Sequence, residues 1–386
     1  MTYFQNKGIK IFLSNSPINS QYDGNYQDLT QYITSYSHTI SASIGFDSAV
    51  FSFPASIYNM EQLVENGVGK RVVVYNEGGS MVWEGFVNSI DYEFGVQRTS
   101  RGNLMDVSNR VSVSYAPLNI LVSPPEVGEQ TYTLIEEDED SQDKYGILET
   151  IVSGGTLQDA DAENIRDLYL KENKHVITTN TVSVGVASEP SIKFNCLGYY
   201  HWLEKYVYNC SDTGTTMISD RIEAILDFNP NTKMYSATNN IGYNPWLIVA
   251  FDEDNKTAST HIKELLAFGD ANDNRYIFGC YENRVFEYKV VPTEYEYYTS
   301  SLSGGDSIRN DNNTAIAPYD VRPGKWLMIT DMLIGTSDSQ LASKDDPRGL
   351  FIETVDYTMP TTLLINGERI STFKQRLAVF AGIGSF

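Results

Sequence analysis

Two stretches, FVNSIDYEF at residues 86–94 and FIETVDYTM at residues 351–359, decide the fold that this sequence predicts. Aligned without a gap, they share Phe, Asp and Tyr at three positions, and four more positions carry side chains of similar shape. One match of nine residues between strands is weak evidence on its own. The deciding question is whether the flanking sequence repeats in the same order.

It does repeat upstream, where VGKRVVVYN (68–76) precedes the first stretch and PGKWLMITD (323–331) precedes the second. Each copy therefore contains a Gly-Lys pair, an apolar strand, a connection and a second strand with Asp-Tyr near its end. A shared order of this kind indicates an internal duplication. The equivalent positions that we take as candidate ring-forming residues are Gly69, Lys70, Phe86, Asp91 and Tyr92 in the first copy, and Gly324, Lys325, Phe351, Asp356 and Tyr357 in the second.

A weaker sequence similarity lies further upstream in both copies. AVFSF (49–53) follows Gly45, and RVFEY (284–288) follows Gly279, which predicts a hairpin before each Gly-Lys strand. The connection at 77–80, EGGS, is typical of a tight turn, whereas the equivalent connection at about 332–349 is longer. We expect this long connection to project and contact another chain through Asp338, Lys344, Asp345 and Arg348.

The second strand of each copy alternates, with Phe86, Ile90, Tyr92 and Phe94 on one face and Val87, Ser89, Asp91 and Glu93 on the other. Alternation of apolar and polar residues predicts a half-buried antiparallel strand. Asp91, Glu93 and Asp356 are therefore expected on the polar face. They occupy equivalent places in two copies, so nothing in the sequence brings them into one catalytic cleft.

The middle of the chain, about 119–257, differs from both copies. Its acidic run EEDEDSQDK (136–144) predicts a solvated loop, and helices are expected near 157–172, 216–227 and 258–267 from their apolar spacing. A strand is expected at 191–200. The fold class is thus mainly β with an α+β middle: two β-barrel or sandwich domains at 1–118 and 258–386 flank a mixed domain at 119–257.

Composition limits the function. The 386 residues include 28 Lys plus Arg and 50 Asp plus Glu, a net charge of −22, which argues against a protein that grips nucleic acid through its phosphates. Three cysteines without CxxC spacing predict reduced thiols. No apolar run approaches the length of a membrane span or a signal peptide, so synthesis in a cytoplasm without stable membrane insertion is expected.

Catalytic and metal-binding motifs are missing from the sequence. The four histidines include no pair three or four residues apart, and no GxSxG, Walker loop, HExxH or GxGxxG motif occurs. DEDNKTASTHIKE (252–264) begins like a calcium loop but lacks the glycine and the final Glu of that motif. We therefore expect no cofactor, no metal and no enzymatic activity.

The repeated strands resemble the trimeric hub proteins at the tail tip or baseplate of tailed bacteriophages. The resemblance lies in residues 32–54 and 69–94 at one end and in 274–292, 321–333 and 350–370 at the other, and it is poor in the middle. It implies two tail-tube-like domains per chain, so that a homotrimer forms a pseudo-sixfold ring. The expected partners are the hexameric tail-tube protein, distal tail-tip, spike or fibre proteins, and DNA that passes without specific binding.

The same resemblance places the protein in the virion, at the tail tip. A rival hypothesis remains open at this stage: the 26 tyrosines could form a surface that recognises glycans or a receptor on a phage tail or cell surface. Tyrosines at regular strand positions, however, lie mostly in cores and cross-strand pairs.

Overall fold

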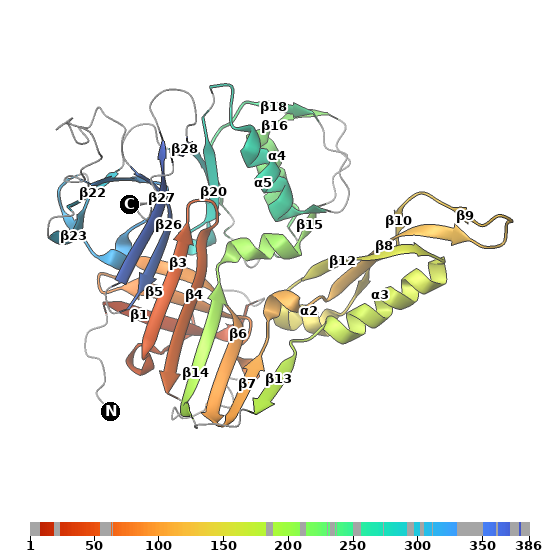
Figure 1. Cartoon of the computed structure of the whole chain (residues 1–386), viewed down its shortest axis with the longest axis horizontal. Coiled ribbons are helices and arrows are strands. Elements are labelled where there is room, and N and C mark those ends of the chain that lie inside the picture. The colour runs from red at the N-terminus through yellow and green to blue at the C-terminus, as the bar shows by residue number, and fades with distance from the viewer. Residues whose placement is uncertain are drawn as a thin grey trace.

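The computed structural model describes most of the chain: residues 8–18, 24–54, 63, 65–182, 188–208, 214–229, 231, 236, 238–249, 256–272, 274–291, 297–301, 305–310, 312–329, 350–359, 362–370 and 378–379. The mainly β fold predicted from the sequence is confirmed. Nineteen of the described strands belong to one branched sheet, which does not close into a barrel, and the others form a five-stranded sheet and two strand pairs (Figure 1).

The N-terminal part supplies most strands of one half of the large sheet. They are β1 (Ile9–Pro17), β2 (Tyr26–Asp28), β3 (Ser35–Ser41), β4 (Gly45–Pro54), β5 (Lys70–Asn76), β6 (Met81–Gly95) and β7 (Gln97–Arg101). Two later strands, β13 (Thr178–Val182) and β14 (Ser188–Leu197), join them: β13 pairs with β7, and β14 lies between β4 and β6. Part of the segment 119–257 is thereby hydrogen-bonded to the N-terminal strands, and the three-domain division stays a prediction.

The C-terminal part supplies the other half. Its strands are β20 (Tyr276–Cys280), β21 (Phe286–Val290), β22 (Tyr297–Ser301), β23 (Gly305–Arg309), β24 (Ala315–Ile316), β25 (Trp326–Ile329), β26 (Leu350–Thr358), β27 (Thr362–Ile370) and β28 (Ala378–Val379), and β17 (Asn240–Ile241) pairs with β21. The two hairpins expected before the Gly-Lys strands are present as β3–β4 and β20–β21.

The middle of the chain forms an arm that extends from the body (Figure 1). In it, β8 (Arg110–Asn119) pairs with β9 (Glu126–Val127), β10 (Thr131–Tyr132), β11 (Glu136–Glu137) and β12 (Glu149–Leu157). The helices α2 (Glu139–Tyr145) and α3 (Asp159–Asn173) complete the arm. The helix predicted near 157–172 is therefore confirmed.

The acidic run at 136–144 was predicted to be a solvated loop, and that prediction was wrong. Residues 136–137 form a strand and 139–145 form a helix, because the Asp138 carboxylate accepts a hydrogen bond from the Ser141 backbone N–H at 2.9 Å. Glu139 and Asp140 then lie in the first turn, where the helix dipole favours negative charge. The buried Tyr145 fixes the other end of the helix.

Beside the body lie α4 (Ile218–Asp227) and α5 (Ala258–Phe268), which match the other two predicted helices. The pairs β15 (Val207–Tyr208) with β19 (Lys256–Thr257) and β16 (Thr215–Met217) with β18 (Leu247–Val249) accompany them, as do five short 3₁₀ turns at Thr30–Tyr32, Leu104–Asp106, Tyr199–Lys205, Glu282–Arg284 and Pro318–Asp320. One apolar core joins α4, α5 and both β3–β4 and β20–β21. In the part of the chain that the structure describes, no helix is both long and apolar enough to cross a membrane.

The two predicted hairpins meet at their glycines. The Cys280 N–H donates to the carbonyl of Ile44 at 2.9 Å, and Gly45 pairs with Cys280 across the two strands. An added Cβ at Gly45 would overlap the backbone of Cys280, and one at Gly279 would lie 2.5 Å from the backbone nitrogen of Gly45. Gly45 also has φ of +84°, which other residues rarely adopt. Two backbones therefore approach at a distance that only glycine permits.

We expect Gly45→Ala and Gly279→Ala each to destabilise the protein by at least about 2 kcal/mol, because the added methyl group meets backbone atoms that cannot move aside. Thermal unfolding followed by circular dichroism measures the effect. Gly214→Ala is the matched control, since its Cβ would meet nothing within 4 Å. A variant at either position that is as stable as the control would show that the contact is looser than described.

Candidate assembly surface

The two Gly-Lys strands form hairpins with the same register. In the first copy, β5 pairs with β6 so that Arg71 faces Phe86 and Val72 faces Gly85. In the second copy, β25 pairs with β26 so that Trp326 faces Phe351 and Leu327 faces Leu350. These are the same partners that the sequence alignment matches.

The glycine before each strand also makes the same contact. The Gly69 N–H donates to the carbonyl of Val87 at 2.8 Å, and the Gly324 N–H donates to the carbonyl of Ile352 at 2.9 Å. Both glycines have positive φ, +82° and +79°. Because the hydrogen bond, the backbone conformation and the register all agree, the two hairpins are structurally equivalent.

The equivalence extends to the strand that lies beside each hairpin. On one edge β6 pairs first with β5 and then, through residues 90–94, with β7. On the corresponding edge β26 pairs first with β25 and then, through residues 354–358, with β3. The first copy completes this edge with its own β7, whereas the second copy receives β3 from the first. The two copies are therefore joined into one sheet by a strand that crosses between them.

Asp91 and Asp356 have equivalent partners in this arrangement. Ser100 on β7 donates to Asp91 Oδ1 at 2.7 Å, and Thr39 on β3 donates to Asp356 Oδ1 at 2.6 Å. Asn195 on β14 donates to the other oxygen of Asp91 at 3.1 Å. Each carboxylate thus fixes the neighbouring strand through a hydroxyl.

These carboxylates lie on one continuous polar face. Paired residues in antiparallel strands share a face. The registers place Asp91, Lys193, Ser52 and Ser35 in one row across the sheet. They place Leu197, Ser48, Thr39 and Asp356 in a second row on the same face. Four strand spacings separate Asp91 from Asp356, roughly 19 Å, which is too far for a catalytic carboxylate pair. We call this the polar sheet face. Its other side chains include Ser37, Val50, Ser89, Glu93, Arg98, Asn195, Thr354 and Thr358.

The apolar candidates are covered by other side chains. Phe86 and Phe351 are fully buried: Phe86 packs on Trp202 with ring centroids 5.3 Å apart, and Phe351 packs on Trp326 at 5.6 Å. Tyr357 is buried beside His38, and Tyr92 is half-buried against the core. These residues therefore build the core of each copy and do not form its surface.

The simple alternation expected before Ile90 is interrupted. Both Phe86 and Val87 are buried, because a bulge in the pairing of β6 with β14 lies at Asn88. The alternation resumes at Ser89, and Ile90 is again in the core. A bulge of this kind inserts one residue and reverses the face of those that follow.

The two lysines differ in environment. Lys70 is half-buried, and burial lowers the pKa of its ammonium group. Lys325 Nζ lies 5.6 Å from the ring centroid of Tyr298. Asp338, Lys344, Asp345 and Arg348 lie outside the described residues.

Sequence reasoning missed the contribution of β14 to the polar sheet face. This strand was expected near 191–200 but was placed with the middle domain, although it lies between β4 and β6. The available signal was the alternation of Ile192, Phe194 and Cys196 with Lys193 and Asn195, which marks a half-buried strand but does not identify its neighbours. Many tyrosines of the described residues belong to the core: Tyr36, Tyr145, Tyr199, Tyr200, Tyr206, Tyr288 and Tyr357 are fully buried or nearly so, whereas Tyr243 is 70% exposed.

A buried carboxylate lies where the two halves meet. Glu84 on β6 is 3% exposed, and its Oε1 lies 3.7 Å from Arg284 Nε of the C-terminal half. The backbone at Asn283 and Arg284 has φ of 60° and 62°, an uncommon conformation for such residues. Burial raises the pKa of Glu84 to about 7, although Arg284 and Arg71 both oppose the shift.

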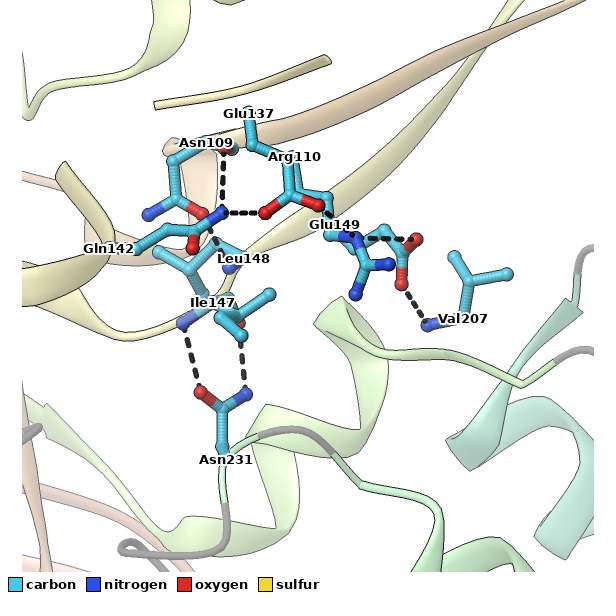
Figure 2. Close-up of polar contacts among 9 residues, drawn as sticks. All are labelled: Asn109, Arg110, Glu137, Gln142, Ile147, Leu148, Glu149, Val207 and Asn231. Carbon is cyan, nitrogen blue, oxygen red and sulfur yellow. Dashed lines mark hydrogen bonds and ion pairs between the residues drawn. The ribbon is translucent and has the colours of Figure 1, made fainter. Parts of the chain in front are cut away.

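The arm is attached to the body by a second polar cluster, shown in Figure 2. The Asn231 side chain forms two hydrogen bonds of 2.9 Å with the backbone N–H and carbonyl of Ile147. Glu149 accepts from the Val207 N–H at 3.1 Å and lies 3.7 Å from Arg110. Asn109 accepts from the Leu148 N–H at 2.8 Å. Because these side chains bond to backbone, they fix the base of the arm in one orientation.

Other candidate chemistry is sparse in the described residues. They contain no group of three or more His, Cys, Asp or Glu arranged to hold a metal ion. Cys196 and Cys280 are buried and free. His201 lies between Asp47, at 2.8 Å, and Glu204, at 3.2 Å, and these carboxylates raise the pKa of its imidazole to about 9 against the opposing effect of burial.

Comparison with known proteins gives fold-level similarity alone. No protein family model and no curated protein sequence matches the chain. Among solved structures, the tail protein from Neisseria meningitidis MC58 is similar at a TM-score of 0.40 and 8% identity, covering 91% of this chain and 92% of that one. The 43 kDa tail protein of prophage MuSo2 from Shewanella oneidensis is similar at 0.39 and 9%, covering 92% and 96%. Likeness at this level carries no functional inference by itself.

The raised pKa of Glu84 predicts a pH-dependent stability. A carboxyl with a higher pKa in the folded state binds protons more tightly there, so its contribution is complete below pH 4.5 and is lost as pH rises through about 7. Glutamine stays neutral at every pH, so the Glu84→Gln protein should not lose this stability. We therefore expect the difference in Tm, variant minus native, to be at least about 2 °C larger at pH 8 than at pH 5. Glu353→Gln, at a half-buried carboxylate paired with Arg275, controls for loss of a charge. If the difference in Tm between the Glu84→Gln and native proteins were the same at pH 5 and pH 8, the raised pKa of Glu84 would be contradicted.

Proposed function

We propose that the chain is a structural, non-enzymatic protein of a phage tail, and specifically a tail-tip or baseplate hub. Three copies would form a pseudo-sixfold ring that continues the tail tube and lets DNA pass. The observation that carries this proposal is the equivalence of the β5–β6 and β25–β26 hairpins, which share a register, a glycine contact and a third strand. One chain thus contains two comparable units side by side in one sheet.

A protein with two such units fits an assembly in which symmetry changes. Three chains present six comparable units, which match a ring of six single-unit subunits. The proposed partners are accordingly the hexameric tail-tube protein on one side and distal tail-tip, spike or fibre proteins on the other. The protein would be synthesised in the host cytoplasm and reside in the virion, without stable insertion into a membrane.

The polar sheet face is the surface that we assign to the passage. It carries Asp91, Glu93 and Asp356 among Ser, Thr and Asn side chains. Its cations among the described side chains are few: Lys193 and Arg98, of which Arg98 lies within 4 Å of Asp91 and Glu93. DNA binding requires clustered cations that replace the counterions of the phosphates. A face of hydroxyls and carboxylates offers DNA no such contacts, so DNA would slide past it.

The oligomeric state tests the ring. We expect native mass spectrometry or analytical ultracentrifugation of the full chain, alone or with its hexameric tube protein, to give a species of three copies. Electron microscopy of that species should show six similar lobes around a channel. A chain that stays monomeric or dimeric at micromolar concentration in the presence of the tube protein would refute the hub assignment.

DNA binding tests the assigned passage separately. We expect no gel shift of duplex DNA by the native protein at physiological salt. The double variant Glu93→Lys with Asp356→Lys should bind DNA at least about tenfold more tightly than Asp161→Lys, which reverses an exposed charge on α3. Micromolar or tighter, salt-sensitive binding by the native protein would overturn the passage, although not the ring.

A further inference from the structure

The far end of the arm carries an exposed aliphatic hairpin. The loop between β8 and β9 reads ILVSPP (120–125). Three of its side chains and one of β9 are exposed: Ile120 52%, Leu121 93%, Val122 37% and Val127 58%. Exposed aliphatic side chains clustered at one place usually mark an interaction site. We call residues 120–127 the arm tip.

The arm tip is held away from the body by a rigid support. The ten residues of β8 extend roughly 30 Å, and β12 runs parallel to β8 along most of this length. α3 packs on the same sheet through Val113, Tyr115 and Ala162. The polar cluster of Figure 2 then fixes the base. An apolar group on such a support meets a partner without first having to become ordered.

The arm is also the most acidic part of the chain. Residues 119–174 contain 14 Asp or Glu and 4 Lys or Arg, a net charge of −10 out of −22 for the whole protein. In the same segment Leu134 is 81% exposed and Leu168 56%. The surface behind the tip is therefore strongly negative and interrupted by single apolar side chains.

These features identify one class of occupant. A bilayer is disfavoured because residues 119–130 contain no Trp, Tyr, Phe, Lys or Arg to anchor at the lipid interface, and because an acidic arm is repelled by anionic headgroups. The arm of a second copy is disfavoured because it would bring two segments that each carry a net charge of −10 into contact. A surface of opposite charge attracts the arm and accelerates its encounter.

We propose that the arm tip docks into an apolar socket on a different protein, whose surface around that socket is basic. The aliphatic tip supplies the buried contact, and the carboxylates of the arm steer and orient the partner. This interaction goes beyond the proposed ring, because it uses the arm and leaves the polar sheet face untouched.

Site-specific photocrosslinking identifies the occupant. The full chain, with benzoylphenylalanine in place of Leu121, is irradiated in cells that also express the genes neighbouring its own. A second sample carries the same residue in place of Val249, which is 79% exposed on β18 and serves as the matched control. We expect one protein to crosslink at position 121 and not at 249. Crosslinks to lipid, crosslinks to another copy of the chain, or no crosslink beyond that of the control would each overturn the proposal.

Binding between the purified chain and the crosslinked protein then tests the chemistry. Leu121→Ser should weaken binding at least tenfold, because a buried aliphatic side chain is lost, whereas Val249→Ser should leave it unchanged. Raising NaCl from 0.05 to 0.5 M should weaken binding, and less so in a Glu126→Gln, Glu129→Gln variant. Equal affinity of the Leu121→Ser and Val249→Ser proteins, or affinity independent of salt, would refute the basic socket. A chain that binds this partner yet forms no trimer would leave this proposal standing and refute the ring.

Discussion

The pairing of β3 with β26 holds the two copies of the repeated unit in one sheet, and the rest of the architecture depends on it. Thr39 donates to Asp356 in the middle of this pairing, and the Ala42 N–H donates to the carbonyl of Glu353 where β3 ends. The turn that follows β3 then leads directly to Gly45, where the backbones of the β3–β4 and β20–β21 hairpins touch. Sheet hydrogen bonds and a close backbone contact therefore fix the same junction from two sides.

Burial at this junction controls its ionisable groups. His38 on β3 is 2% exposed, accepts or donates one hydrogen bond with the Tyr36 hydroxyl at 2.9 Å, and has its pKa lowered to about 3 by desolvation, with Arg322 acting in the same direction. Glu84 is shifted the other way by the same physical cause. Both shifts favour the neutral form. Fully buried groups at the junction are thus held neutral, while the ion pair of Arg275 with Glu353 lies at its half-exposed rim.

The sequence predicted what depends on local pattern and failed where distant segments meet. The two hairpins, three helices and the alternation after Ser89 follow from residue spacing, which the structure shares. It did not predict that β14 lies between β4 and β6, because alternation fixes the faces of a strand but not its neighbours. The helix at 139–145 was missed because one capping contact, Asp138 to Ser141, outweighs the repulsion within an acidic run. The structural equivalence of the two strands follows from their shared sequence pattern, whereas their role as an assembly surface stays a prediction.

The two copies are equivalent but their edges are not, and this difference constrains any ring. In the second copy the place beside β26 is taken by β3 from the first copy, whereas beside β6 it is taken by β7, which is followed by β13. A neighbouring chain therefore cannot pair with β6 in the way that β3 pairs with β26, because those backbone groups of β6 already bond to β7. In a ring of three, contacts within a chain and contacts between chains must then alternate around the channel and differ in kind. The arm emerges between β7 and β13, so the segment that occupies this edge is also the one that carries the acidic projection. In the proposed trimer, this insertion would give six comparable sheet units but only three arms.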